Sequence, residues 1–270
     1  MTAHATALVA PEAKIADDVE IGPWCVVGAG VRLGPGVRLR SHVVIEGETS
    51  LGAGCEVHPF AVLGAAPQHA AYKPGDPVRL EVGARCLIRE HVTLHGGSVV
   101  GRGVTTIGDD CAFYVGSHVG HDCRVGDHVT MANGAALGGH TVIGDHVFLG
   151  GGSAVQQRCR IGRHAFIGGL AGANLDVIPF AMAWGNHARL EGLNLIGLKR
   201  RGFSRETITT LRHAYRALFG CADPRPFRER VEASASAFGG SPEAMEIIDF
   251  IRAEPARPLI LPARERQEAE

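Results

Sequence analysis

The segment IGDDCAFYVGSHVGHDCRVGDHVTMANGAALGGHTVIGDHVFLG, residues 107–150, returns to an apolar residue at every sixth position. These positions are Ile107, Phe113, Val119, Val125, Met131, Leu137, Ile143 and Leu149. An amphipathic helix repeats its apolar face about every 3.6 residues and a half-buried strand every 2 residues, so neither explains the period. One inward anchor in every six residues instead predicts a triangular coil of three short strands and three turns, in which successive coils stack as parallel strands.

The same period covers most of the chain before residue 173. It runs from Val9 to Leu63, resumes at Val82 and continues to Val100, shifts by one residue, and then runs from Ile107 to Ile167. These positions form 25 coil sides. At about 4.8 Å between neighbouring strands they make roughly eight coils and a prism on the order of 40 Å long. We therefore expect a mainly β fold, a parallel β-helix in which residues eighteen apart are neighbours on adjacent coils.

Two regions depart from the repeat and define the domain organisation. The break after Leu63 is rich in Pro, Gly and Ala and predicts a looped-out insertion at about residues 65–79. Beyond the repeat, Ser204 can cap a helix that ends near Phe219, and a second helix is expected after Ser241. We expect residues 1–191 to form the β-helix and residues 192–270 a C-terminal helical domain that covers one open end.

The composition excludes several classes of protein. No apolar run approaches the roughly 18 residues that span a bilayer, so we expect no transmembrane segment. The first twenty residues lack the pattern of a signal peptide, which indicates a cytoplasmic location. A net charge of −1 gives no overall basic field for nucleic acid.

The seven cysteines do not form a disulfide framework, because their number is odd. Six of them occupy the fourth position after an anchor, where Val or Ala stands in other coils, so we expect small buried apolar side chains. They are Cys25, Cys55, Cys86, Cys111, Cys123 and Cys159. Cys221 lies outside the repeat.

Six of the fourteen histidines share one position, the third after an anchor, which predicts solvated turn residues. They are His42, His91, His128, His140, His146 and His164. His121 lies one place earlier, is followed directly by Asp122, and has His118 three residues before it. It is therefore the first candidate for chemistry.

Stacking supplies neighbours for this histidine. Eighteen residues after His121 and Asp122 stand Gly139 and His140, and Gln157 lies one coil further. Gly139 leaves room and a backbone N–H, and a carboxylate can fix the tautomer of an imidazole. This pattern is typical of a general base with an oxyanion donor nearby. A metal site formed by His118, His121 and His140 is the rival interpretation.

The repeat and these residues together resemble the hexapeptide-repeat acyltransferases, and within them the UDP-N-acetylglucosamine acyltransferases. The most specific segments are SHVGHDCRVG at 117–126, ANGAALGGH at 132–140, GNHA at 185–188 and NLIGLKRRGFSRE at 194–206. The last two lie outside the repeat, so the repeat does not account for them. The resemblance extends over nearly the whole chain.

The resemblance implies a left-handed β-helix that assembles as a homotrimer with active sites between subunits. The implied reaction moves an (R)-3-hydroxyacyl chain from acyl carrier protein to the 3-hydroxyl of UDP-N-acetylglucosamine, the first step of lipid A biosynthesis, without cofactor or metal. His121 would be the general base, Asp122 would orient it, and the Gly139 N–H would stabilise the oxyanion.

The resemblance also implies a substrate groove. Its side chains would come from Lys73, His95, His118, His140, Gln157, His187, Asn194, Arg200 and Arg201. The two arginines suit a diphosphate, and the basic run that includes Lys199 and Arg205 suits an acidic carrier protein, although a solvated helix start explains it equally well. Gly169 matches the position that limits chain length in the family, and a glycine there favours a long acyl chain.

Four departures from the family pattern affect the acceptor. They are Ala71, Gly96, Gln156 and Ile196. Because buried polar groups discriminate strongly between related substrates, the acceptor could instead be the 3-amino analogue of the sugar. An acetyl-CoA-dependent acetyltransferase, a non-enzymatic β-solenoid scaffold and a zinc-dependent carbonic anhydrase are further alternatives. The N-acyltransferase of the same pathway is disfavoured, because it has an additional N-terminal domain.

Overall fold

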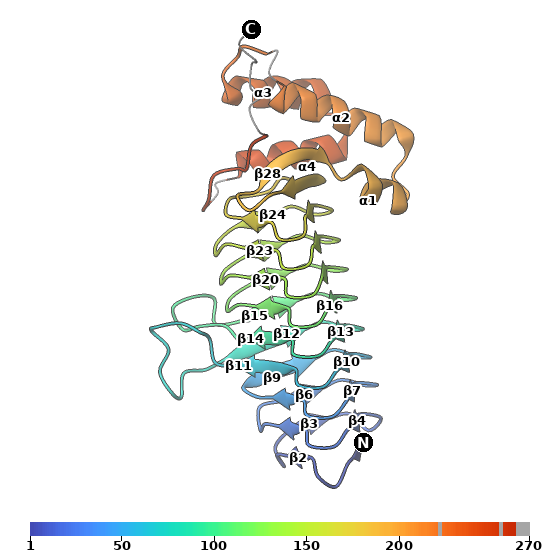
Figure 1. Cartoon of the computed structure of the whole chain (residues 1–270), viewed down its shortest axis with the longest axis vertical. Coiled ribbons are helices and arrows are strands. Elements are labelled where there is room, and N and C mark those ends of the chain that lie inside the picture. The colour runs from blue at the N-terminus through green and yellow to red at the C-terminus, as the bar shows by residue number, and fades with distance from the viewer. Residues whose placement is uncertain (221–222, 254–255, 263–270) are drawn as a thin grey trace.

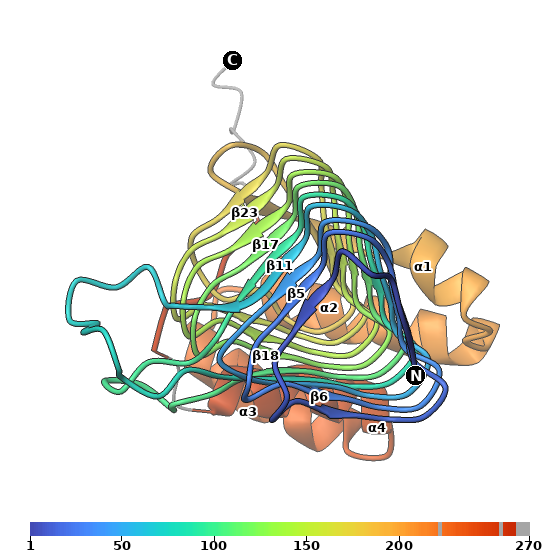
Figure 2. The same cartoon turned by 90° about the horizontal axis from the view of Figure 1, so that it is seen from below.

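Three sheets form a triangular prism; their strands are parallel except for the last pair, β27 (Ala181–Trp184) and β28 (Arg189–Leu193), which is antiparallel. The helices of the described residues lie at the C-terminal end of the prism (Figure 1). The computed structural model describes residues 1–220, 223–253 and 256–262. Seen along the prism, the coils superpose as a triangle, with the insertion projecting from one corner and α1 (Leu195–Arg200) beside another (Figure 2). This is the left-handed parallel β-helix that the sequence pattern and the resemblance together predict.

Each coil contributes one short strand to each sheet in turn, so the prism has an AB edge, a BC edge and a CA edge. Sheet A contains β1 (Thr2–Ala3), β4 (Glu20–Ile21), β7 (Arg38–Leu39), β10 (Glu56–Val57), β13 (Leu87–Ile88), β16 (Ala112–Phe113), β19 (Thr130–Met131), β22 (Phe148–Leu149), β25 (Phe166–Ile167), β27 (Ala181–Trp184) and β28 (Arg189–Leu193). Sheet B contains β2 (Leu8–Val9), β5 (Val26–Val27), β8 (Val44–Ile45), β11 (Val62–Ala65), β14 (Thr93–His95), β17 (His118–Val119), β20 (Ala136–Leu137), β23 (Ala154–Val155) and β26 (Gly172–Ala173). Sheet C contains β3 (Lys14–Ile15), β6 (Arg32–Leu33), β9 (Glu48–Leu51), β12 (Arg79–Val82), β15 (Thr105–Ile107), β18 (Arg124–Val125), β21 (Val142–Ile143) and β24 (Arg160–Ile161).

The register of the sheets confirms that eighteen residues complete one coil. His118 pairs with Ala136, and Ala136 pairs with Ala154. The second residue of most strands points inward, and the anchors Val119 and Leu137 are fully buried. The six repeat cysteines are also buried, as predicted, whereas Cys221 lies outside the described residues.

Two loops leave the prism at the BC edge. Residues 66–78 connect β11 to β12, and residues 96–104 connect β14 to β15. The prediction of a coil anchor at Val100 was wrong, because this side chain lies in the second loop and is 57% exposed. The six-residue spacing from Leu94 to Val100 is therefore accidental, and the one-residue shift before Ile107 reflects the loop.

The corners of the prism explain the position of the repeated histidines. His128, His146 and His164 have φ values of 56°, 60° and 59°, the left-handed region that His, Asn and Asp tolerate better than most residues. Their rings stack along the CA edge with centroids 4.7 Å apart. The prediction of a solvated turn was wrong for His164, which is only 4% exposed because Phe180 and Phe203 pack against its ring.

The helices are α1, α2 (Arg205–Phe219), α3 (Phe227–Phe238) and α4 (Pro242–Arg252). The two predicted helices are confirmed, since the Ser204 and Ser241 side chains accept from backbone N–H groups in the first turns of α2 and α4. Helix α3 was not predicted, because its residues have little apolar period and its N-terminus has no side-chain cap. Arg163 and Glu246 join the prism to α4 through a hydrogen bond of 2.5 Å.

None of the helices in the described part of the chain has both the length and the apolar character needed to cross a bilayer.

Candidate active site

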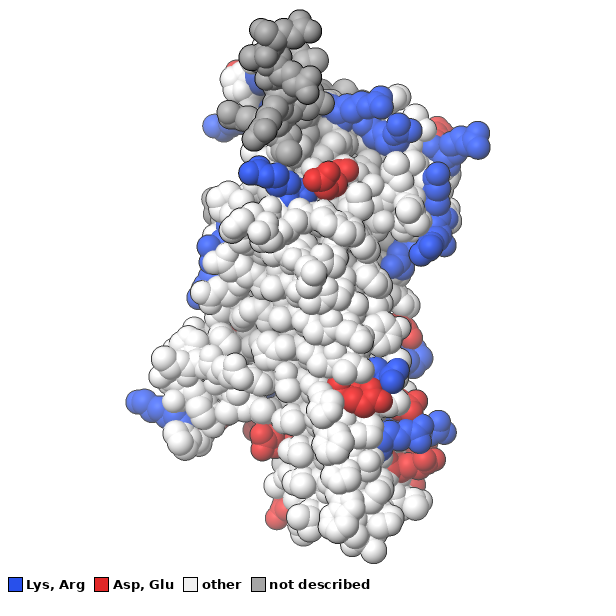
Figure 3. Space-filling view, in the orientation of Figure 1, with Lys and Arg blue, Asp and Glu red and all other residues white. Residues whose placement is uncertain are grey.

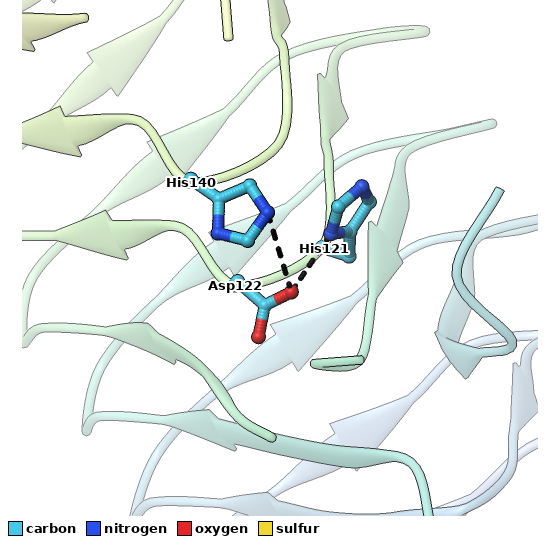
Figure 4. A group of neighbouring side chains, drawn as sticks. All are labelled: His121, Asp122 and His140. Atoms are coloured by element: carbon cyan, nitrogen blue, oxygen red, sulfur yellow. Dashed lines mark hydrogen bonds and ion pairs between the residues drawn. The ribbon is translucent and has the colours of Figure 1, made fainter. Parts of the chain in front are cut away.

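His121 and Asp122 form a buried pair at the BC edge, in the turn that follows β17. Nδ1 of His121 lies 2.8 Å from Oδ2 of Asp122 (Figure 4). The two residues are 8% and 1% exposed. Asp122 occupies the left-handed corner position of its coil, with a φ of 61°, and its backbone N–H donates to Oγ1 of buried Thr105.

The loop of residues 96–104 holds the carboxylate of Asp122. The Ser98 hydroxyl donates to Oδ2 over 2.6 Å, and the N–H groups of Ser98 and Gly103 donate to Oδ1 over 3.1 Å each. Burial by itself raises the pKa of Asp122, but the hydrogen bonds from Ser98 and His121 outweigh it, so the pKa lies below its usual value. Asp122 is therefore an ionised acceptor at neutral pH.

This carboxylate determines the tautomer of His121. An ionised carboxylate only accepts hydrogen bonds, so Nδ1 of His121 carries the proton of the 2.8 Å bond. In the neutral ring the lone pair then lies on Nε2. The imidazole can accept a proton from a substrate at Nε2 while Asp122 stabilises the resulting positive charge.

Gly139 and His140 lie one coil above this pair, as the spacing of eighteen predicts. A Cβ on Gly139 would lie 2.6 Å from Nε2 of His121, so the ring rests directly over the glycine backbone. Nε2 of His140 lies 4.0 Å from Oδ2 of Asp122. The Gly139 N–H donates to no backbone group among residues 1–220, 223–253 and 256–262, and the residue is buried beside the ring of His121.

Three further imidazoles lie near His121. His69, from the loop of residues 66–78, meets its ring edge to face with centroids 5.2 Å apart, and Nδ1 of His69 accepts from the Ala71 N–H. Nδ1 of His118 lies 2.8 Å from Oγ1 of Thr93, and the ring of His95 packs against His118. Burial lowers the pKa of His95 to about 4 and also lowers the pKa of His118.

Sequence reasoning missed His69 and Ser98. Both lie in loops that follow no period, so stacking arithmetic does not place them. The sequence held one indication of their position. Both loops come after an anchor of sheet B, Leu63 or Leu94, and His121 likewise comes after the sheet B anchor Val119. All three segments therefore leave the prism at the same edge.

The other predicted site residues lie apart from His121 within one chain. Gln157 is exposed on a higher coil of the BC edge, and Lys73 is exposed in the insertion. Gly169 is at the AB edge, and His187 follows β27 near β26.

A second group of predicted residues lies at the CA edge. Asn194 caps α1 and donates to the carbonyl of His164 over 3.0 Å. Arg201 donates to Nδ1 of His146 over 3.0 Å and to its carbonyl over 3.1 Å. Arg200 is the last residue of α1. One chain therefore does not bring all the predicted residues into a single site.

His121, Asp122 and His140 also have the composition of a metal-binding group. One candidate ligand atom from each lies within 4.8 Å of the others.

Two family models match the chain. Residues 12–47 match the bacterial transferase hexapeptide repeats, and residues 176–260 match the second domain of UDP-N-acetylglucosamine O-acyltransferase. Among curated proteins, the chain is similar to the acyl-[acyl-carrier-protein]--UDP-N-acetylglucosamine O-acyltransferase of Caulobacter vibrioides, with 58% identity over 98% of this chain and 100% of that protein. The protein of the same name from Thermodesulfovibrio yellowstonii is 45% identical over 93% and 96%.

Solved structures of the same family have the same fold. LpxA from Acinetobacter baumannii matches with a TM-score of 0.91 and 39% identity, over 96% of this chain and all of that one. The UDP-N-acetylglucosamine acyltransferase of Francisella novicida matches with a TM-score of 0.92 and 33% identity, over 96% and 94%. The chain therefore belongs to the acyl-[acyl-carrier-protein]--UDP-N-acetylglucosamine O-acyltransferase (LpxA) family.

Proposed function

We propose that the protein transfers an (R)-3-hydroxyacyl chain from acyl carrier protein to the 3-hydroxyl of UDP-N-acetylglucosamine, the first step of lipid A biosynthesis. Family membership supports the reaction. The observation that carries the mechanism is the His121–Asp122 pair lying directly over Gly139.

In the proposed mechanism, Nε2 of His121 takes the proton from the sugar hydroxyl as its oxygen attacks the thioester carbonyl. Asp122 keeps the imidazole in the reactive tautomer and stabilises the imidazolium. The tetrahedral oxyanion receives a hydrogen bond from the Gly139 N–H. As the intermediate collapses, the carbon–sulfur bond breaks and His121 returns its proton to the departing thiolate.

A homotrimer is part of the proposal, and the charge pattern of the surface supports it. The outward residues of sheet B are uncharged along its whole length, and those of sheet A are uncharged from β13 to β27. They are Leu8, Val26, Val44, Val62, Thr93, His118, Ala136, Ala154 and Gly172 on sheet B, and Leu87, Ala112, Thr130, Phe148, Phe166 and Met182 on sheet A. Sheet C instead presents Lys14, Arg32 and Arg124. Figure 3 shows few charged side chains over the middle of the molecule.

This pattern fits three copies with their AB edges at a common axis, so that sheet A of one copy packs against sheet B of the next. The CA edge of one copy then comes beside the BC edge of its neighbour, and Arg200 and Arg201 approach His121 of that neighbour. Gly169 lies at the AB edge, at the inner end of the groove that forms between sheet A of one copy and sheet B of the next. The exposed AB-edge aromatics Trp24 and Phe60, 59% and 50% exposed in one chain, become covered.

In this arrangement the two arginines bind the diphosphate, and His118, His140, Gln157, Asn194, His187, His95 and Lys73 line the groove. Gly169 leaves room for a long acyl chain. Residues 1–191 form the catalytic β-helical unit. We assign the C-terminal helical unit to residues 192–270, of which the structure describes 192–220, 223–253 and 256–262. Its basic residues, beginning with Lys199, favour an acidic carrier protein. The proposed location of the enzyme is the cytoplasm.

The 3-amino analogue is the second candidate acceptor. No Lys or Arg in the described part of the chain forms an ion pair with Asp122, whose partners are Ser98, Gly103 and two imidazoles. A buried carboxylate without a Lys or Arg partner suits a protonated amine, which His121 would deprotonate. The departures at Ala71, Gly96, Gln156 and Ile196 are consistent with either sugar.

One experiment tests the proposal. Purified protein is incubated with (R)-3-hydroxyacyl carrier proteins of several chain lengths and with each UDP-sugar, beside the His121→Ala variant. We expect ester formation with UDP-N-acetylglucosamine, a preference for long chains, and loss of turnover in the variant. Faster amide formation would establish the second candidate, and acylation of neither sugar would refute both. Turnover with acetyl-CoA alone would favour an acetyltransferase.

A further inference from the structure

Three metal-ligand atoms converge at the BC edge. Oδ2 of Asp122 lies 2.8 Å from Nδ1 of His121 and 4.0 Å from Nε2 of His140 (Figure 4). A tetrahedral zinc ion with bonds of about 2.0–2.2 Å holds its ligand atoms about 3.3 Å apart. The two distances from Asp122 each differ from this value by about 0.5–0.7 Å, and all three ligand atoms lie within 4.8 Å of one another, so small side-chain movements would convert this cluster into a coordination site.

The surroundings of Asp122 favour a cation. Its carboxylate is the negative group of the cluster, and its donors, Ser98 and Gly103, are uncharged. These donors also fix the orientation of the carboxylate, as partners of metal ligands usually do. Two imidazoles and one carboxylate suit Zn²⁺ or a similar first-row cation, whereas Mg²⁺ and Ca²⁺ prefer oxygen ligands.

We propose that His121, Asp122 and His140 bind one divalent cation of the zinc class, and that the bound cation inactivates the enzyme.

The inhibition follows from the tautomer of His121 and rests on its proposed role as general base. In the metal-free pair, the proton is on Nδ1 and the lone pair is on Nε2. A cation that takes the lone pair of Nδ1 replaces the hydrogen bond to Asp122 and leaves the proton of the neutral ring on Nε2. The ring loses no proton overall, but it no longer has a basic nitrogen directed at the acceptor.

Cation binding is measured first, without substrate. Full-length protein freed of metal is dialysed against ZnCl₂, and bound metal is determined by elemental analysis. Co²⁺ serves as a spectroscopic probe, because its visible absorption reports nitrogen and oxygen coordination. We expect about one cation per chain, and an affinity at least about tenfold lower in Asp122→Asn and in His140→Asn. His128→Asn, which changes an exposed imidazole on the CA edge, is the matched control and should bind as the wild type does.

Acyl transfer is then measured in the same samples. We expect turnover to fall in proportion to the cation bound and to return on addition of a chelator. Absence of stoichiometric binding, equal binding by His140→Asn and wild type, or full turnover with one cation bound would each overturn the proposal. Failure of the proposed function is a separate result, since metal-free enzyme would then acylate neither sugar whatever its affinity for zinc.

Discussion

The imidazole of His121 lies so close to the backbone of Gly139 that a side chain at position 139 would displace the ring. A Cβ at position 139 would come within 2.6 Å of Nε2 and 2.7 Å of Cε1 of the ring. The same contact places the nitrogen proposed as the base beside the N–H proposed as the oxyanion donor. Any side chain at this position should therefore affect both parts of the mechanism.

Gly139→Ala should lower kcat by about 100-fold or more, the range expected when a general base is displaced. The protein should remain folded, because the ring of His121 lies at the edge and can rotate away. Gly240→Ala is the control, since no atom lies within 4 Å of a Cβ at that position. Steady-state kinetics and thermal unfolding measure the two effects; an active Gly139→Ala variant would contradict the assigned geometry.

Ser98→Ala should lower kcat about tenfold, because a hydrogen bond to a charged group contributes about 1.5–3 kcal/mol. Since this bond lowers the pKa of Asp122, its loss should also raise the pKa of that carboxyl, which an NMR titration of the isotope-labelled side chain measures. The matched control is Ser117→Ala, because the Ser117 hydroxyl is buried without a hydrogen-bond partner among the described residues. An unchanged pKa of Asp122 and an unchanged kcat in Ser98→Ala would argue against a positioning role.

His146→Phe should raise the KM for the UDP-sugar several-fold and leave kcat within about twofold. Phenylalanine preserves the ring stack between His128 and His164 but removes the nitrogen that accepts from Arg201. The loss of a charge-assisted bond would loosen an arginine proposed to bind diphosphate. His128→Phe changes a ring of the same stack, but His128 does not contact Arg201, so this variant should leave KM unchanged. Equal effects on KM in the two variants would exclude the Arg201 contact as the cause.

Ala154→Glu should dissociate the proposed trimer, because it places an unpaired carboxylate within the packed face of sheet B. Val142→Glu introduces the same charge on sheet C, where Val142 is 38% exposed, and should not. Light scattering coupled to size exclusion measures the mass, expected at about three times 28.4 kDa for the wild type and for Val142→Glu. A wild-type mass of one chain would refute the trimer, and with it the shared site.

Acid should destabilise the protein through His164, because burial lowers the pKa of this histidine to about 3. In the unfolded chain this histidine has an ordinary pKa of about 6.5, so between pH 6.5 and 3 the unfolded state binds more protons than the folded state. The contribution of His164 to the free energy of unfolding is therefore fully present above pH 6.5 and decreases as the pH falls through this range. His164→Phe should therefore lose less stability than the wild type between pH 7.5 and pH 5, by up to about 2 kcal/mol. Urea unfolding at both pH values measures this difference, and identical losses would contradict it.

The repeat made much of the site predictable. Because eighteen residues complete a coil, the neighbours of His121 and Asp122 could be counted along the chain, and Gly139 and His140 are where the count places them. The caps at Ser204 and Ser241 likewise located α2 and α4. These features depend on local rules, the spacing of anchors and the capping of helix ends.

Features without a period were not predictable. The anchor assigned to Val100 was wrong, since one apolar residue at the right spacing does not distinguish a coil from a loop. His69 and Ser98 were not predicted, because both lie in loops that follow no period. Helix α3 was not predicted, because its sequence lacks an apolar stripe.

The amino-acid sequence alone determined the β-helix, the buried cysteines and the pairing of His121 with Asp122 and Gly139, because a six-residue winding converts sequence distance directly into spatial position. Only the tertiary structure decided that two loops return to the BC edge and bring Ser98 to the carboxylate and His69 to the imidazole. It also decided that Arg201 lies at the CA edge of the prism, beside His146. These outcomes depend on how aperiodic segments pack against the coils, and the spacing of anchors carries no information about that packing.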